Sequence, residues 1–189
     1  MRPSHEELKQ LWLYSYSRAS LLEAQQWLYA MEHTDEKSPQ FRALICASVI
    51  AYARPFTTSQ VTAKERVVPL QGVLAPPALE AAHATVLKLR NKLMGHKDAT
   101  PAKGDPATPN VMLIRRNAKG FDLHTIIVEG MLPETRKEVI SLCDHFVAHC
   151  VSHVQPIIDH YGPEIMRHPI GLYELLVTEP PNDWLKPHQ

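Results

Sequence analysis

Arg90, Asn91 and His96 are the residues whose types and spacing point most directly to chemistry. An arginine guanidinium is permanently charged and can hold two phosphate oxygens at once. An imidazole exchanges protons near neutral pH, so the two groups together suit cleavage of a phosphodiester bond without a metal ion. On a straight helix, Arg90 and His96 would lie about 240° apart around the axis. Gly95 is therefore expected to end the helix and turn the imidazole back toward the guanidinium.

The seven residues from Arg90 to His96, Arg-Asn-Lys-Leu-Met-Gly-His, match a known signature. The pattern of arginine, polar residue, four further residues and histidine resembles that of HEPN domains, which are small helical bundles found in toxin and anti-phage ribonucleases. A second segment, Ala51–Thr57 (Ala-Tyr-Ala-Arg-Pro-Phe-Thr), is similar to the helix end upstream of the signature in the abortive-infection branch. Gly95 departs from the alanine that many relatives carry.

This resemblance implies an all-α, up-and-down bundle over about residues 5–161. It implies a metal-independent endoribonuclease of a toxin–antitoxin pair or of phage defence, with RNA as substrate, an antitoxin protein as a partner and a homodimer with two facing sites. Arg90 would bind the scissile phosphate and His96 would be the general acid and base. Asn91 would orient the histidine or bind phosphate. Lys92 and Lys97 would add positive charge, and Arg54 would be a second phosphate-binding cation.

Each of these residues also has a structural interpretation. Arginine and histidine near a helix C-terminus favour the negative end of the helix dipole, and this applies to Arg54 as well as to Arg90 and His96. The rival functional class is a non-catalytic HEPN-like module that binds nucleic acid or protein. Zero net charge and the departure at Gly95 favour that rival.

His145, His149 and His153 form a second constellation, because a spacing of four residues places them on one stripe of a helix. Two histidines four residues apart on a helix can bind Zn²⁺. No carboxylate or thiol of the same helix, however, completes a tetrahedral set of ligands. Asp144 is expected to point away from the stripe. We therefore expect no bound metal and no cofactor, and interpret the three histidines as lying at a packing boundary or an oligomer interface.

Composition narrows the class of protein. Of the 189 residues, 44% are hydrophobic and 21% are charged, which is usual for a soluble globular domain. Basic and acidic residues number 20 each, which argues against a general polyanion binder. No apolar run is long enough for a membrane span, and the polar N-terminus does not resemble a signal peptide. Cys46, Cys143 and Cys150 are expected to be free thiols, so we expect a cytoplasmic protein.

The elements that must position these residues are four long helices in one domain over residues 1–189. Ser4 and Glu7 predict a capping box that opens a helix to about Met31. Its expected inner face consists of Leu8, Leu11, Trp12, Ser15, Ala19 and Leu22. Ser38 and Pro39 begin the second helix, which ends near Ala53 because Pro55 follows.

The third helix begins at Pro76-Pro77 and carries the signature. A loop over residues 97–110 and a β-hairpin over about residues 111–128 follow. The fourth helix is expected from Pro133 to about Tyr161, closed by Gly162, with an irregular tail over residues 163–189. Its expected core stripe consists of Val139, Cys143, Phe146, Cys150, Val154, Ile157 and Tyr161.

Overall fold

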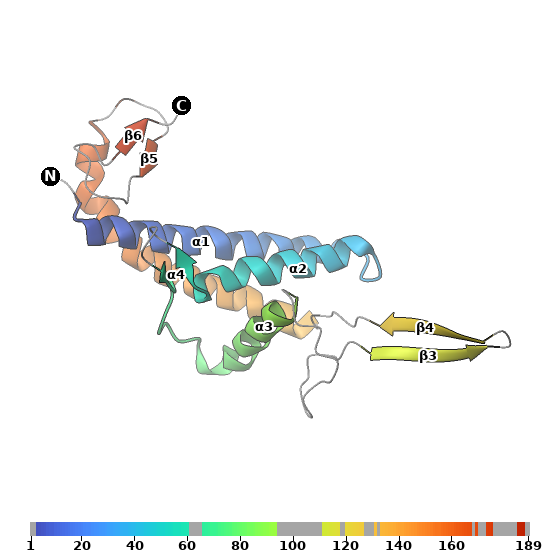
Figure 1. Ribbon diagram of the computed structural model, residues 1–189. Coiled ribbons are helices and arrows are strands. Elements are labelled where there is room, and N and C mark those ends of the chain that lie inside the picture. The colour runs from blue at the N-terminus through green and yellow to red at the C-terminus, as the bar shows by residue number, and fades with distance from the viewer. Residues whose placement is uncertain are drawn as a thin grey trace.

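The computed structural model describes residues 3–60, 66–93, 111–117, 120–126, 131, 133–167, 169, 173–175 and 185–187. Four α-helices make up most of this part of the chain, in agreement with the predicted all-α class. Helix α1 (His5–Met31) and helix α2 (Pro39–Ala53) run side by side in opposite directions. Helix α4 (Pro133–Ile165) lies along α1, and α3 (Glu80–Leu93) packs against α2 and α4 (Figure 1).

Helix α1 begins where the sequence predicted. The Ser4 hydroxyl accepts a hydrogen bond from the Glu7 amide at 3.2 Å, and the Glu7 carboxylate accepts one from the Ser4 amide at 2.7 Å. The predicted inner face was wrong at Ser15 and Ala19, which are exposed, and only Leu8 of the predicted set is fully buried. Leu11, Trp12 and Leu22 are half-buried. The buried positions are Leu8, Leu13, Ser17, Ser20, Leu21, Ala24, Leu28 and Met31. The small residues on this face let a neighbouring helix approach closely. The buried Ser17 hydroxyl donates a hydrogen bond to the Leu13 carbonyl oxygen at 2.8 Å.

Helix α2 has the predicted bounds. Ser38 caps it by accepting a hydrogen bond from the Phe41 amide at 3.1 Å, and Pro39 is its first residue. Its last turn tightens into the 3-10 helix η1 (Arg54–Phe56), which contains Pro55. The side chains of Ile45, Val49 and Tyr52 are buried, so this face of α2 packs into the core, with α1 and α3 as its neighbouring helices.

The segment between η1 and α3 holds a short antiparallel pair that the sequence did not predict, β1 (Ser59–Gln60) with β2 (Arg66–Val67). The 3-10 helix η2 (Pro77–Leu79) then leads into α3. Strands β3 (Val111–Asn117) and β4 (Gly120–Ile126) form the predicted β-hairpin, which extends away from the helices (Figure 1).

The predicted core stripe of α4 is confirmed. Val139, Cys143, Phe146, Cys150, Val154 and Tyr161 are buried, and Ile157 is half-buried. Burial raises the pKa of the Cys143 thiol to about 12 and that of Cys150 to about 11. These two cysteines and the half-buried Cys46 are free thiols, as expected.

The predicted end of α4 at Gly162 was wrong, since the helix continues to Ile165. Gly162 keeps a negative φ, and Ile157 and Ile165 pack against Leu8 and Tyr161 in a small second apolar cluster. Burial of those side chains outweighs the low helix propensity of glycine. The tail is not wholly irregular either, because β5 (Tyr173–Leu175) pairs with β6 (Leu185–Pro187).

Candidate functional site

Arg90 and Asn91 lie on the second half of α3. The helix buries Ala82 and Val86 against the core, which leaves Arg90 half-buried on the flank of that face and Asn91 exposed. Arg90 Nη1 donates a hydrogen bond to Asn91 Oδ1 at 3.1 Å. Within the described part of the chain, no carboxylate pairs with Arg90. Most donors of its guanidinium are therefore available to an anion.

The other predicted members of this site are only partly described. Gly95, His96 and Lys97 lie outside the described residues, and so does the side chain of Lys92, although its backbone belongs to α3. The expected approach of His96 to Arg90 stays a prediction.

Arg54, the predicted second phosphate-binding cation, lies in η1 and pairs with a carboxylate of α1. Its Nη1 is 2.5 Å from Glu23 Oε2, and the two side chains are 39% and 40% exposed. This ion pair holds the end of α2 against α1. An anionic ligand at Arg54 would have to compete with Glu23, which supports the structural interpretation of Arg54.

The described parts of the two segments that resemble the HEPN pattern lie on neighbouring elements, since α2 and η1 carry the first and α3 carries residues 90–93 of the second. A contact that the sequence did not reveal joins α2 to α3. The Tyr52 hydroxyl and His83 Nδ1 are 2.7 Å apart. Two phenylalanine rings pack against His83. Phe56 lies edge-on to the imidazole at 4.7 Å between ring centroids, and Phe146 is tilted to it at 5.5 Å.

The environment fixes the protonation of both partners. Burial raises the pKa of Tyr52 far above its ordinary value, so its hydroxyl stays protonated. Among the described residues, His83 Nδ1 is the acceptor within hydrogen-bond distance of this buried hydroxyl, so we assign Tyr52 as the donor. Burial lowers the pKa of His83, so its imidazole is neutral at pH 7. A neutral imidazole that accepts at Nδ1 carries its proton on Nε2. Tyr52 therefore holds His83 in the tautomer that can donate a hydrogen bond from Nε2.

His83 and Arg90 also share a flank of α3. Seven residues are about two turns, so the two side chains lie within about 20° of each other around the axis and about 10.5 Å apart along it. This spacing is the sequence signal that could have pointed to His83. The described part of the site is thus a guanidinium–amide pair with a neutral imidazole two turns away.

The three histidines on α4 differ in surroundings. His145 Nε2 is 3.3 Å from the Leu74 carbonyl oxygen, and His153 Nδ1 is 2.9 Å from the His149 carbonyl oxygen. The rings of His149 and His153 lie 4.3 Å apart, and Tyr14 of α1 stacks on His153 at 4.5 Å. His149 Nε2 is buried and has no hydrogen-bond partner among the described residues.

Within the described residues, no group of three or more histidine, cysteine, aspartate or glutamate side chains could hold a metal ion. Asp144 accepts a hydrogen bond from Gln25 of α1 at 2.7 Å. The stripe therefore borders the α1–α4 packing through Tyr14.

No protein-family model, curated protein or solved structure matches this chain. Among the described helices, none is long and apolar enough to cross a membrane.

Proposed function

We propose that the protein is a cytoplasmic, metal-independent HEPN-like endoribonuclease that acts in a toxin–antitoxin pair or in phage defence. The observation that carries this proposal is the Arg90–Asn91 pair. The Arg90 guanidinium has no carboxylate partner among the described residues and is hydrogen-bonded to the amide of Asn91. Both residues lie on α3, which precedes His96 in the sequence. The four-helix arrangement, which agrees with the predicted bundle, supports it further.

The proposed chemistry needs only side chains of this chain. His96 takes the proton from a ribose 2′-hydroxyl, whose oxygen attacks the adjacent phosphorus. The bond from phosphorus to the 5′-oxygen breaks, that oxygen leaves with a proton returned by an imidazole, and a 2′,3′-cyclic phosphate remains. Arg90 stabilises the negative charge that grows on the phosphate oxygens. Asn91 holds the guanidinium in place through its Oδ1, while Lys92 and Lys97 add positive charge.

Cleavage of single-stranded RNA in the presence of EDTA tests the proposal. We expect cleavage to require the 2′-hydroxyl and to leave a cyclic phosphate. Arg90→Ala and His96→Ala should each lose about a hundred- to ten-thousand-fold in rate. Arg90→Lys should restore activity only in part, because an ammonium cannot hold two phosphate oxygens in one fork.

Matched controls are available outside α3. Arg167→Ala removes an arginine near the end of α4 whose side chain is 74% exposed, and His33→Ala removes an exposed histidine after α1. Both should keep full activity. Equal cleavage of DNA and RNA, or an active His96→Ala variant, would exclude this mechanism.

The second candidate is a non-catalytic HEPN-like module that binds nucleic acid or protein. The ion pair between Arg54 and Glu23 favours it, because a cation expected to bind substrate already has a carboxylate partner. Zero net charge favours it too. This candidate predicts RNA or antitoxin binding that depends on Arg90, with no cleavage by the wild-type protein. An RNA-binding measurement beside the cleavage assay separates the two candidates.

A further inference from the structure

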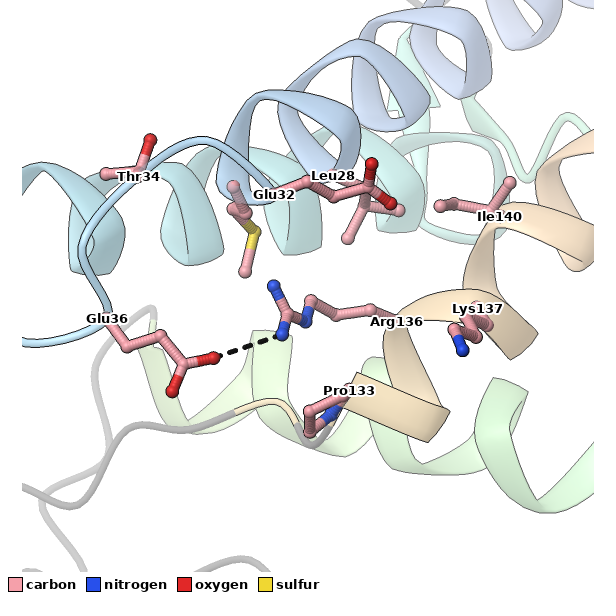
Figure 2. A pocket seen from close by; sticks show the side chains of 9 residues that line it. Leu28, Glu32, Thr34, Glu36, Pro133, Arg136, Lys137 and Ile140 are labelled. Atoms are coloured by element: carbon pink, nitrogen blue, oxygen red, sulfur yellow. Dashed lines mark hydrogen bonds and ion pairs between the residues drawn. The ribbon is translucent and has the colours of Figure 1, made fainter.

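A pocket of about 310 Å³ opens where the end of α1, the α1–α2 connection and the start of α4 meet. Its size lies at the lower end of the range for small-molecule sites, which is about 300–1,000 Å³. Figure 2 shows Arg136 reaching across the middle of this pocket from α4. The lining residues are Leu28, Met31, Glu32, Thr34, Glu36, Pro133, Arg136, Lys137 and Ile140.

Arg136 is held in place more firmly than a surface arginine. Its side chain is only 13% exposed, and its guanidinium carbon lies 5.5 Å from the centre of the Phe41 ring, within the range of a cation–π contact. Nη2 donates a hydrogen bond to Glu36 Oε1 at 3.2 Å. A guanidinium has five N–H donors in a planar fork, and Glu36 is the acceptor that it reaches among the described residues.

Glu36 is the less fixed partner of this ion pair. Its side chain is 68% exposed and lies in the connection between α1 and α2. A carboxylate at the edge of a guanidinium can turn into solvent when another carboxylate takes its place. Glu36 therefore occupies the position that the acid group of a ligand would take.

The charges of the lining fit one negative charge on the ligand. With Glu36 turned outward, Arg136 and Lys137 face a single carboxylate, that of Glu32. The N-terminal end of α4 at Pro133 adds the positive end of a helix dipole. Leu28, Met31 and Ile140 supply an apolar wall for the rest of the ligand.

We propose that this pocket binds a small organic monocarboxylate with a short apolar body, whose carboxylate displaces Glu36 from Arg136. The site is independent of the ribonuclease proposal. Arg136 supplies the paired donors, the apolar wall takes the hydrocarbon, and Glu36 acts as an internal competitor that lowers the affinity.

Hexanoate is a suitable probe, with hexanamide and hexylamine as analogues of similar size at equal ionic strength. NMR of the Arg136 Nε–H group in the full-length protein reports binding directly. We expect a saturable shift with hexanoate and none with hexanamide or hexylamine. Absence of a shift with hexanoate, or an equal shift with hexanamide, would overturn the proposal.

Two substitutions give opposite results if the proposal is correct. Glu36→Gln should tighten hexanoate binding several-fold, because the competing negative charge is removed. Arg136→Gln should weaken it about tenfold or more, since tenfold corresponds to about 1.4 kcal/mol of lost interaction. Arg42→Gln, which alters an exposed arginine of α2, is the matched control and should leave the affinity unchanged. Weaker binding in Glu36→Gln would show that the Arg136–Glu36 pair only holds the connection to α4.

Discussion

The hydrogen bond between Tyr52 and His83 is the strongest constraint on a single side chain near the candidate site. Tyr52 is fully buried, and its hydroxyl is the donor that sets the tautomer of His83. Tyr52→Phe removes only that hydroxyl and leaves Nδ1 of a half-buried imidazole without its donor. We expect a loss of about 1–3 kcal/mol in the free energy of unfolding, measured by denaturant titration.

Tyr29→Phe is the control for this change, because Tyr29 is 48% exposed. It should leave stability nearly unchanged. Nitrogen-15 NMR of His83 gives an independent measurement, since the wild-type ring should carry its proton on Nε2 and the Tyr52→Phe ring should show a mixture of tautomers. A Tyr52→Phe protein that is as stable as wild type would contradict the assigned hydrogen bond.

The lowered pKa of His149 leads to a prediction of how the free energy of unfolding changes with pH. Burial, and then the neighbouring His153 and His145, lower its pKa in the folded protein, whereas an unfolded histidine titrates at about 6.5. Below about pH 6.5, the unfolded chain therefore binds more protons at this residue than the folded protein does. The free energy of unfolding consequently falls as the pH falls through this range. His149→Gln should lose less stability than wild type between about pH 7 and about pH 5. His33→Gln, at an exposed position, should follow the wild-type curve.

At the scale of helices and strands, the sequence predicted the bounds of α2 and the core stripe of α4 because each signal was local and unambiguous. Ser38, Pro39 and Pro55 mark the limits of α2, and α4 has one clear apolar side. Helix α1 has apolar residues on several sides, so periodicity could not select its buried face. Packing against α2 and α4 made that choice, in favour of the side with Ser17, Ser20 and Ala24.

The same limit applies to the candidate site. Arg90 and Asn91 could be singled out because they are adjacent in one short segment. The Tyr52–His83 contact joins residues 31 positions apart on two helices, and the Arg136–Glu36 contact joins residues 100 positions apart. Neither pair has a pattern in the linear sequence. The first contact depends on how α2 and α3 come together, and the second on how the α1–α2 connection meets α4.

Two glycines allow a matched test of the helix assignment. Gly162 lies inside α4, and a β-carbon added there would meet no atom within 4 Å other than those of its chain neighbours. Alanine has a higher helix propensity than glycine by about 0.5–1 kcal/mol, but its β-carbon would crowd the ring of Pro163, the next residue of the helix. Gly162→Ala should therefore leave the free energy of unfolding nearly unchanged. Gly72 has equally open surroundings but a φ of +78°. Gly72→Ala should instead destabilise by about 1–2 kcal/mol, because an L-residue is strained in that conformation. Thermal unfolding of both variants distinguishes these outcomes, and equal effects would contradict the helical backbone at Gly162.

At the scale of the whole molecule, electrical neutrality limits how RNA can bind. With 20 basic and 20 acidic residues, attraction to phosphates has to come from a local group such as Lys88, Arg90, Lys92 and Lys97. Each phosphate contact on a single strand contributes about −0.7 to the slope of log affinity against log salt. We expect a slope no steeper than about −3 for 2′-O-methyl RNA, and a shallower one for Arg90→Ala. A much steeper slope in a titration by fluorescence anisotropy would place the binding surface elsewhere.

One carboxylate connects the beginning of α1 to the far end of α4. Glu7 Oε2 accepts hydrogen bonds from the amide and the hydroxyl of Ser4, both at 2.7 Å, and from the Tyr161 hydroxyl at 3.0 Å. Residues 154 positions apart in the sequence therefore share one acceptor, beside the separate apolar cluster of Leu8 and Tyr161. Fraying of the first turn of α1 would also break the hydrogen bond from the Tyr161 hydroxyl to Glu7. We therefore expect the two helix ends to open as one cooperative unit, with amide protons that exchange with solvent together and ahead of those in the main core, as hydrogen-exchange measurements would show.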